Sequence, residues 1–214
     1  MGKLHYKAEA HLSLANLIAI HNQNFYTPNV EKIGKQIIQS CIICKLNKNM
    51  YKKQTLGGNR QEKDNLEVGK IWTCDIAYLP KSLTGFKYLL VFAKNLTWYL
   101  ACICLKNITC QTVSQALKVF LGIIPSPAKI KSDFGAEFSS FFTLTCNKFG
   151  IQHSNEIPRR SQSSGSCELG IKLLKQGLNR ICAANPKGRG IWPDLIPKLV
   201  QSINSVCPYK SCLS

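Results

Sequence analysis

The chain has 214 residues, in which 28 Lys and Arg side chains against 11 Asp and Glu give a formal charge of +17 at pH 7. Hydrophobic residues make up 45% of it, which excludes a disordered basic tail. The length of the chain allows one large domain or a domain with a small module. The longest apolar run, Trp98–Leu105, is far shorter than the roughly 20 residues of a membrane-spanning helix. These features predict a polyanionic partner, nucleic acid before any other, and no membrane partner.

The N-terminal residues lead into no apolar segment of the kind that secretory signals contain. Eleven cysteines are present, and most stand singly on apolar stretches, as Cys102 and Cys146 do. This distribution is typical of reduced core cysteines rather than of disulfides, so we expect an intracellular protein.

The first part of the chain has the pattern of a small helical unit. Within residues 1–47, apolar residues recur with helical spacing over 12–20 and 30–41, and a Tyr-Thr-Pro sequence at 26–28 interrupts them. Residues 48–69 are polar and basic, which is typical of a linker.

This N-terminal unit contains a candidate zinc site. His5, His11, Cys41 and Cys44 supply two imidazoles and two thiolates, the donors of a closed tetrahedral zinc site. Zinc would clamp a segment that is too small for a large core of its own. Two buried cysteines with surface histidines are the alternative, and His21 competes with His5 or His11 as a ligand.

From residue 70 onward, strand patterns come first and helices later, which predicts an α/β fold with a mixed sheet flanked by helices. The expected strands cover 71–79, 88–93, 99–105, 128–132 and 151–157, and the expected helices cover 109–124, 138–149, 166–181 and 192–206. His153 lies in the last of these strands and is expected to be structural rather than a ligand.

Three carboxylates of this second part are the candidate catalytic residues. Asp75 lies inside an apolar strand, where an unpaired carboxylate is costly. Asp133 ends a short strand, and Glu168 opens a helix. Acids on strands and on a helix are what a two-metal Mg2+ or Mn2+ site needs. The alternative is an ordinary turn residue at Asp133 and, at Glu168, a first-turn acid favoured by the helix dipole.

The helix that begins near Glu168 also carries a basic face. Lys172 and Lys175 follow Glu168 by four and seven residues, so the three side chains share one face. We predict that both lysines meet DNA phosphates beside the site, and a solvated basic face is the alternative. A Ser- and Gly-containing loop precedes the helix and is a candidate mobile loop over the site, in which Gln162 and Ser163 are further candidates for DNA contact.

Several stretches combine into a family resemblance that covers nearly the whole chain. They are Phe25-Tyr26-Thr27-Pro28, Cys41 to Lys48, Trp72 to Asp75, Gly85 to Phe92, Ser132 to Phe138 and Pro158 to Glu168. None is specific alone, but together they resemble the integrases of retroviruses and Ty3/gypsy-like retrotransposons. The H-H-C-C unit with the basic linker after it is similar to the zinc-binding domain of that family.

The resemblance implies an RNase H-like catalytic core at 70–214, a zinc-binding domain at 1–47 and a D,D-35-E triad at Asp75, Asp133 and Glu168. It implies a nuclear enzyme that trims DNA 3′ ends and joins them to target DNA with two Mg2+ or Mn2+ ions and no small-molecule cofactor. DNA and further copies of the chain on the DNA ends are the partners it implies.

The sequence also departs from the family pattern. Only 34 residues separate Asp133 from Glu168, and Phe134, Ile171 and Ser161 stand where Asn, Asn and Pro are common. We also expect the small basic β-barrel that usually follows the core in that family to be absent. These departures favour the alternative of a decayed or domesticated integrase that binds nucleic acid without catalysis. A nuclease of the ribonuclease H kind and a plain zinc-finger DNA-binding protein are further alternatives.

Overall fold

The computed structural model describes residue 1 and residues 14–41, 70–95, 97–155 and 165–205. Within these ranges, every helix is too short or too polar to span a bilayer. His5, His11, Cys44 and the predicted linker 48–69 lie outside the described residues.

Two helices, α2 (Leu14–Asn22) and α3 (Val30–Ser40), form the described N-terminal part. They pack closely at Gly34, where an added Cβ would lie 2.7 Å from Cδ1 of Leu14. The two predicted helices are thus confirmed, although α2 extends two residues beyond the predicted end. It continues through His21 and Asn22 before the turn that leads to Pro28.

The second part is built on a five-stranded sheet of order β3-β2-β1-β4-β5. β1 is the central strand, antiparallel to β2 and parallel to β4, and β2–β3 is antiparallel while β4–β5 is parallel. The bounds are β1 Ile71–Tyr78, β2 Tyr88–Lys94, β3 Leu100–Leu105, β4 Lys129–Ser132 and β5 Gln152–Asn155. The α/β mixed sheet expected from the sequence is therefore confirmed.

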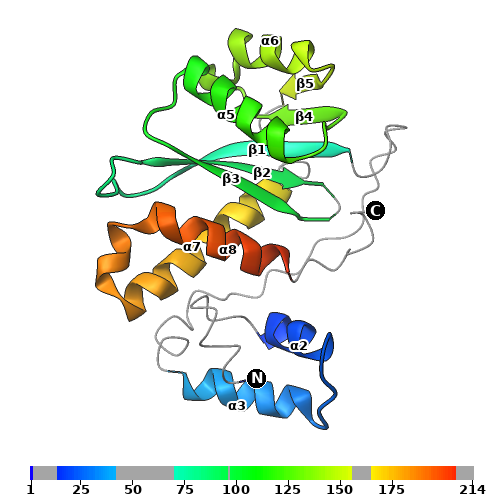
Figure 1. The fold of residues 1–214 in the computed structure, drawn as a ribbon, viewed down its shortest axis with the longest axis vertical. Coiled ribbons are helices and arrows are strands. Elements are labelled where there is room, and N and C mark those ends of the chain that lie inside the picture. The colour runs from blue at the N-terminus through cyan, green and yellow to red at the C-terminus, as the bar shows by residue number, and fades with distance from the viewer. Residues whose placement is uncertain (2–13, 42–69, 96, 156–164, 206–214) are drawn as a thin grey trace.

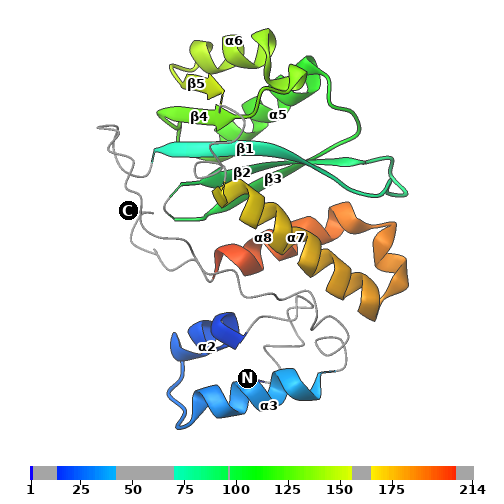
Figure 2. The same cartoon turned by 180° about the vertical axis from the view of Figure 1, so that it is seen from behind.

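Helices cover both faces of this sheet, as Figures 1 and 2 show from opposite sides. One face is covered by α5 (Cys110–Ile123), the short 3-10 helix η2 (Ala136–Phe138) and α6 (Ser140–Lys148). The other face is covered by α7 (Gly165–Ala184) and α8 (Trp192–Asn204), which the 3-10 helix η3 (Pro186–Arg189) connects.

The prediction of one helix over 138–149 is wrong at its start. The chain forms η2 first, and Ser139 then takes an extended conformation (φ −75°, ψ −153°) before α6 begins at Ser140. The helix predicted over 109–124 is confirmed as α5. The hydroxyl of Thr109 accepts a hydrogen bond from the Thr112 N–H at 3.2 Å, which caps a free donor of the first turn.

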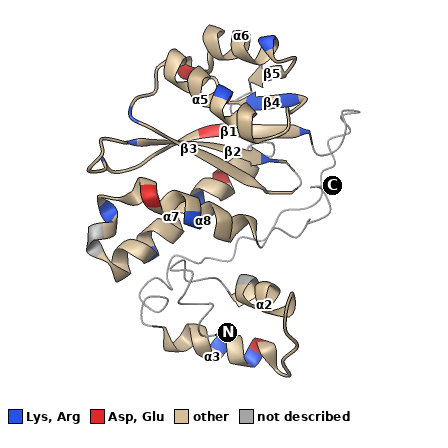
Figure 3. Ribbon diagram, in the orientation of Figure 1, with Lys and Arg blue, Asp and Glu red and all other residues tan. Residues whose placement is uncertain are grey.

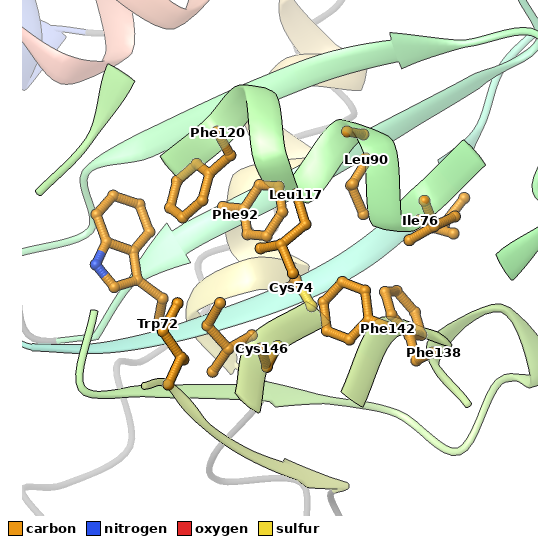
Figure 4. Packing of buried hydrophobic residues seen from close by; sticks show 14 of the residues in the cluster. Trp72, Cys74, Ile76, Leu90, Phe92, Leu117, Phe120, Phe138, Phe142 and Cys146 are labelled. Atoms are coloured by element: carbon orange, nitrogen blue, oxygen red, sulfur yellow. The ribbon is translucent and has the colours of Figure 1, made fainter. Parts of the chain in front are cut away.

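The sheet separates two hydrophobic clusters because successive strand residues point to opposite faces. Under α5 and α6, Phe92 stacks on Phe120 with ring centroids 4.0 Å apart, and Trp72 meets the edge of Phe120 at 5.0 Å (Figure 4). On the opposite face, the side chains of Ala77 and Val91 join a cluster with residues of α7 and α8.

None of the eight cysteines in the described ranges forms a disulfide bond. Burial raises the pKa of Cys146 to about 12 and that of Cys104 to about 11. Burial also raises the pKa of Cys74 well above its usual value. Thiols with such high pKa values are protonated at neutral pH, which makes them packing residues rather than nucleophiles.

Candidate active site

Asp75 lies on the central strand, on the sheet face that α7 and α8 cover. Its neighbours Cys74 and Ile76 point into the cluster under α5, so Asp75 points the other way, with Ala77. Asp75 is the acidic residue of β1, and Figure 3 shows this strand, with a red acidic segment, in the middle of the sheet. The side chain is half-buried, and its Oδ1 accepts a hydrogen bond from the backbone N–H of Ile76 at 2.7 Å.

The environment of Asp75 raises the pKa of its carboxyl group. Burial is the largest cause, and the negative charges of Asp133 and Glu168 act in the same direction. The hydrogen bond from Ile76 and the positive charge of Lys175 oppose this rise. The charges of Asp133 and Glu168 therefore act on the carboxyl group of Asp75, although Asp75 lies on β1, Asp133 directly follows β4 and Glu168 lies on α7.

Asp133 directly follows β4, the parallel neighbour of β1. Thr73 is opposite Lys131 in that ladder, so the register extended by two residues brings Asp133 level with Asp75. The exposed carboxylate of Asp133 accepts a hydrogen bond from the Gly135 N–H at 3.1 Å. This bond within the turn fixes the carboxylate at the end of the strand.

His153 anchors the residue before Asp133. Its Nε2 lies 2.8 Å from the hydroxyl of Ser132, and its Nδ1 lies 2.8 Å from the hydroxyl of Thr143. Its ring also meets the edge of Phe142, with centroids 5.0 Å apart. His153 thus ties the end of β4 to β5 and α6. Both ring nitrogens have hydroxyl partners, in agreement with the structural role expected from the sequence.

Glu168 is exposed in the first turn of α7. The residues just before it attach this turn to the sheet. The hydroxyl of Ser166 donates to Oδ1 of Asn95 at 3.2 Å, and the thiol of Cys167 donates to the carbonyl of Val91 at 3.4 Å. Val91 is the β2 partner of Asp75 in the antiparallel ladder, so this turn is held next to the strand that carries Asp75.

The chemistry of these carboxylates fits a hard divalent cation. Mg2+ and Mn2+ prefer oxygen donors, and a half-buried acid among other acids favours a bound cation that offsets their repulsion. Within the described part of the chain, no three His, Cys, Asp or Glu side chains are close enough together to hold a metal ion. Asp133 and Glu168 are thus near enough to act on the pKa of Asp75, but the described side chains do not form a complete set of metal ligands.

The lysines predicted to bind DNA lie on α7. Lys172 and Lys175 are both exposed, and the charge of Lys175 acts on Asp75. Lys175 is therefore on the side of the helix that faces the acids, as its spacing from Glu168 predicted. Gln162 and Ser163, the other candidates for DNA contact, lie outside the described residues.

Of the zinc-site candidates, the structure describes Cys41 and His21. Cys41 is buried directly after α3. His21 is buried too, with Nε2 2.7 Å from the hydroxyl of Thr27 and its ring stacked on Phe25. Its Nδ1 is buried and has no hydrogen-bond partner among the described residues, so that nitrogen is the one with which His21 could bind a metal.

The sequence alone did not identify Asn95, which directly follows β2, as a residue that supports the site. Its side chain meets Ser166, 71 residues further along the chain, and Thr73, 22 residues before it. No local pattern signals such contacts, because hydrophobic periodicity and capping motifs act over a few residues only.

Similar sequences come from retroviral polyproteins. The Gag-Pol polyprotein of Koala retrovirus is 26% identical over 178 residues, which are 81% of this chain and 10% of that protein. The Pol polyprotein of Radiation murine leukemia virus (strain Kaplan) is 27% identical over 177 residues, 81% of this chain and 29% of that protein. The chain thus spans less than a third of these relatives. No protein-family model matches it.

Similar solved structures contain retroviral integrases. A chain of the simian T-cell lymphotropic virus intasome in complex with PP2A regulatory subunit B56 gamma superposes with a TM-score of 0.66 at 18% identity, over 99% of this chain and 68% of that one. The HTLV-2 integrase catalytic core domain in complex with magnesium, in its dimeric form, gives 0.52 at 20% identity over 63% of this chain and 85% of that one. The sheet and its helices therefore have the RNase H-like fold of an integrase catalytic core.

Proposed function

We propose that this chain, which resembles retroviral integrases in sequence and has the fold of their catalytic core, is a polynucleotidyl transferase of a retrovirus-like element. It would trim DNA 3′ ends and transfer them to target DNA. The observation that supports this most directly is the placement of the three acids: the register of β1 and β4 brings Asp133 level with Asp75, and the turn of α7 that carries Glu168 is held next to β1 and β2. A cluster of acids that repel one another is explained by a reaction that uses bound cations. The charge of +17 on the chain is explained by a polyanionic substrate.

The residues of this chain have distinct parts in the proposed reaction. Asp75, Asp133 and Glu168 would hold the metal ions. When bound there, Mg2+ or Mn2+ would supply Lewis-acid activation of the attacking oxygen and stabilise the charge on the leaving oxygen. The half-burial of Asp75 limits access of water to that carboxylate, and Lys175 places a positive charge near the acids.

In the proposed chemistry, a water molecule first attacks a phosphorus atom near the DNA 3′ end. The 3′ hydroxyl that this cleavage releases then attacks a phosphorus atom of target DNA, whose own 3′ oxygen leaves. Both steps are in-line displacements and need no covalent enzyme intermediate. Burial raises the pKa of Cys74, the neighbour of Asp75 in the chain, and its side chain lies in the core on the opposite face of the sheet, which agrees with a mechanism that needs no protein nucleophile.

The proposed partners follow from the same assignment. Lys172 and Lys175, with Gln162 and Ser163, would contact DNA beside the acids. We further propose that the chain binds DNA ends as a homo-oligomer, acts in the nucleus and carries a structural zinc ion. The ligands of that ion would be His5, His11, Cys41 and Cys44, with His21 as the competing candidate for one histidine position.

One observation favours a second candidate function, that of an integrase-like protein that binds nucleic acid without catalysis. Phe134, which follows Asp133 and stands where the family has Asn, is 59% exposed. With Phe in place of Asn at this position, the chain lacks a polar side chain beside the acids. This reading keeps DNA binding and drops the two displacement reactions.

A nicking assay on supercoiled plasmid separates the two functions. The full chain is incubated with Mg2+ or Mn2+, and its Asp75→Asn variant is compared with Asp194→Asn, which also removes one charge but lies in α8. We expect nicking by the unmodified chain and by Asp194→Asn, and none by Asp75→Asn. Plasmid binding without nicking in either metal supports the second function, and nicking that survives Asp75→Asn refutes the catalytic assignment.

A further inference from the structure

Asn95, directly after β2, joins two distant segments through one atom. Its Oδ1 accepts a hydrogen bond from the hydroxyl of Thr73 at 2.9 Å and another from the hydroxyl of Ser166 at 3.2 Å. Its backbone N–H also donates to the carbonyl of Ile71 at 3.0 Å. A carboxamide oxygen has two lone pairs and no proton, so both hydroxyls must donate and the oxygen is fully used.

Each of these hydroxyls lies two residues before a candidate catalytic acid. Thr73 precedes Asp75 on β1 and points to the same face of the sheet. Ser166 precedes Glu168 in the first turn of α7. The side chain of Thr73 is buried, and those of Asn95 and Ser166 are half-buried, so water has limited access to the two bonds.

Other contacts hold the same turn of α7, but they reach different strands. The thiol of Cys167 donates to Val91 on β2, and a thiol is a weak donor. At Gly170, an added Cβ would lie 2.7 Å from Cδ2 of Leu100, so the helix backbone packs closely on β3. Asn95 differs from both contacts because its side chain bonds to the helix and to β1, the strand of Asp75.

From this arrangement we infer that Asn95 is a positioning residue, which sets Glu168 relative to Asp75 by fixing the first turn of α7 against β1. The inference rests on the proposed function where it concerns activity, whereas the structural coupling stands independently of it. Asn95 touches no reacting atom. It acts through Ser166 and Thr73, and the distance between two of the three acids depends on that bridge.

Hydrogen exchange of the full chain, followed by mass spectrometry without metal or DNA, tests the coupling. Asn95→Leu removes the acceptor at similar size, and Ser166→Ala removes only the bond to α7. Both are expected to raise exchange of the amides at 166–170 by about tenfold, which is what the loss of one net hydrogen bond allows. Ser140→Ala, at the start of α6 on the opposite face of the sheet, is the matched control and leaves these amides unchanged.

A rescue variant separates positioning from general packing. Asn95→Asp keeps an acceptor oxygen and is expected to retain the protection that Asn95→Leu loses. The double variant Asn95→Leu/Ser166→Ala is expected to exchange no faster than Asn95→Leu alone, because both changes remove the same bond. If Asn95→Leu does not fold, the comparison of Ser166→Ala with Ser140→Ala decides the matter.

The plasmid assay adds a catalytic measurement. A displaced Glu168 lowers the rate of the chemical step while the basic surface still binds DNA, so Ser166→Ala should reduce kcat by about 10- to 100-fold with KM for DNA unchanged. Unchanged exchange at 166–170 in both Asn95→Leu and Ser166→Ala overturns the inference, and so does an unchanged kcat in an active enzyme. An inactive unmodified chain refutes the proposed function alone, since the exchange measurement still tests the bridge.

Discussion

His153 holds the hydroxyl of Ser132, the residue just before Asp133, at 2.8 Å from its Nε2. The other ring nitrogen holds Thr143 of α6 at the same distance. His153→Phe keeps a ring that can pack on Phe142 but leaves both hydroxyls without this partner. We expect it to lower the free energy of unfolding by about 1–3 kcal/mol. Urea denaturation measures this loss, and Gln152→Ala, an exposed position of the same strand, should change the unfolding free energy by less than about 0.5 kcal/mol.

The same histidine predicts a dependence of stability on pH. Burial lowers the pKa of His153 below its ordinary value of 6.5, so the folded protein binds this proton less readily than the unfolded chain does. The contribution of His153 to the unfolding free energy should therefore be constant above about pH 6.5. It should fall as the pH decreases from there toward the lowered pKa of the folded state. Melting temperatures of the unmodified chain and of His153→Phe should converge on acidification. Parallel pH curves for the two proteins would exclude His153 as the source.

The raised pKa of Asp75 predicts a pH dependence of stability that is opposite in sign to that of His153. Its pKa is raised, chiefly by burial, so the unfolded chain releases this proton at lower pH than the folded protein does. Stability is lost as pH rises from about 3.8 through the folded pKa, and the loss is complete above the folded pKa. Asp75→Asn retains an acceptor for the Ile76 N–H and should raise the unfolding free energy at pH 7 while abolishing activity. The stability difference should disappear near pH 3, and a destabilised variant at pH 7 would contradict the assignment.

The basic face of α7 predicts a salt dependence of DNA binding. Replacing both Lys172 and Lys175 with Glu should weaken binding and reduce the slope of log K against log salt by about 2, which is about 1 for each lost phosphate contact. The double variant Lys118→Glu/Lys148→Glu makes the same change of charge on exposed positions of α5 and α6. Titrations that give the same slope for both double variants would show that charge alone, rather than a specific face, governs binding.

Close packing of α7 on α8 predicts different effects for two glycine substitutions. At Gly177, an added Cβ would lie 2.6 Å from Cδ2 of Leu199, a buried side chain of α8. Gly177→Ala should therefore lower the unfolding free energy by about 1–3 kcal/mol. At Gly122, which is exposed in α5, an added Cβ meets nothing within 4 Å. Gly122→Ala should raise it by up to about 1 kcal/mol, because alanine has the higher helix propensity. Equal effects at both positions would exclude close packing as the cause.

The elements of this fold could be predicted where local physics decides them. The helix α5 has an apolar face at helical spacing, a Thr109 cap and prolines after its end, and each of these signals acts within a few residues. The break at Ser139 has no such signal, since Phe138 and Phe142 keep helical spacing across it. Both rings are buried in the same cluster, so tertiary packing satisfies them without one continuous helix.

The acids of the candidate site could be proposed from the sequence, whereas the residues that support them could not. Asp75 stands out because a carboxylate in an apolar strand is costly, and in the folded protein burial raises its pKa. The contacts of His153 depend on the parallel pairing of β4 and β5, and the bridge through Asn95 depends on the packing of α7 against the antiparallel pair of β1 and β2. Strand order is a property of the whole chain, so the partners of Asn95 and His153 could not be identified before the fold was known.

The sheet divides the second part of the molecule into two layers with separate interiors. Leu90 belongs to the interior under α5 and α6, whereas the next residue, Val91, belongs to the one under α7 and α8. The acids are divided between the sheet and one covering layer, because Asp75 lies on β1 and Asp133 directly follows β4, while Glu168 lies on α7. Detachment of the α7–α8 layer alone therefore dismantles the acidic centre while the opposite interior stays packed. We therefore expect the proposed activity to be lost more readily than the fold, so that mild denaturant abolishes it before the sheet unfolds.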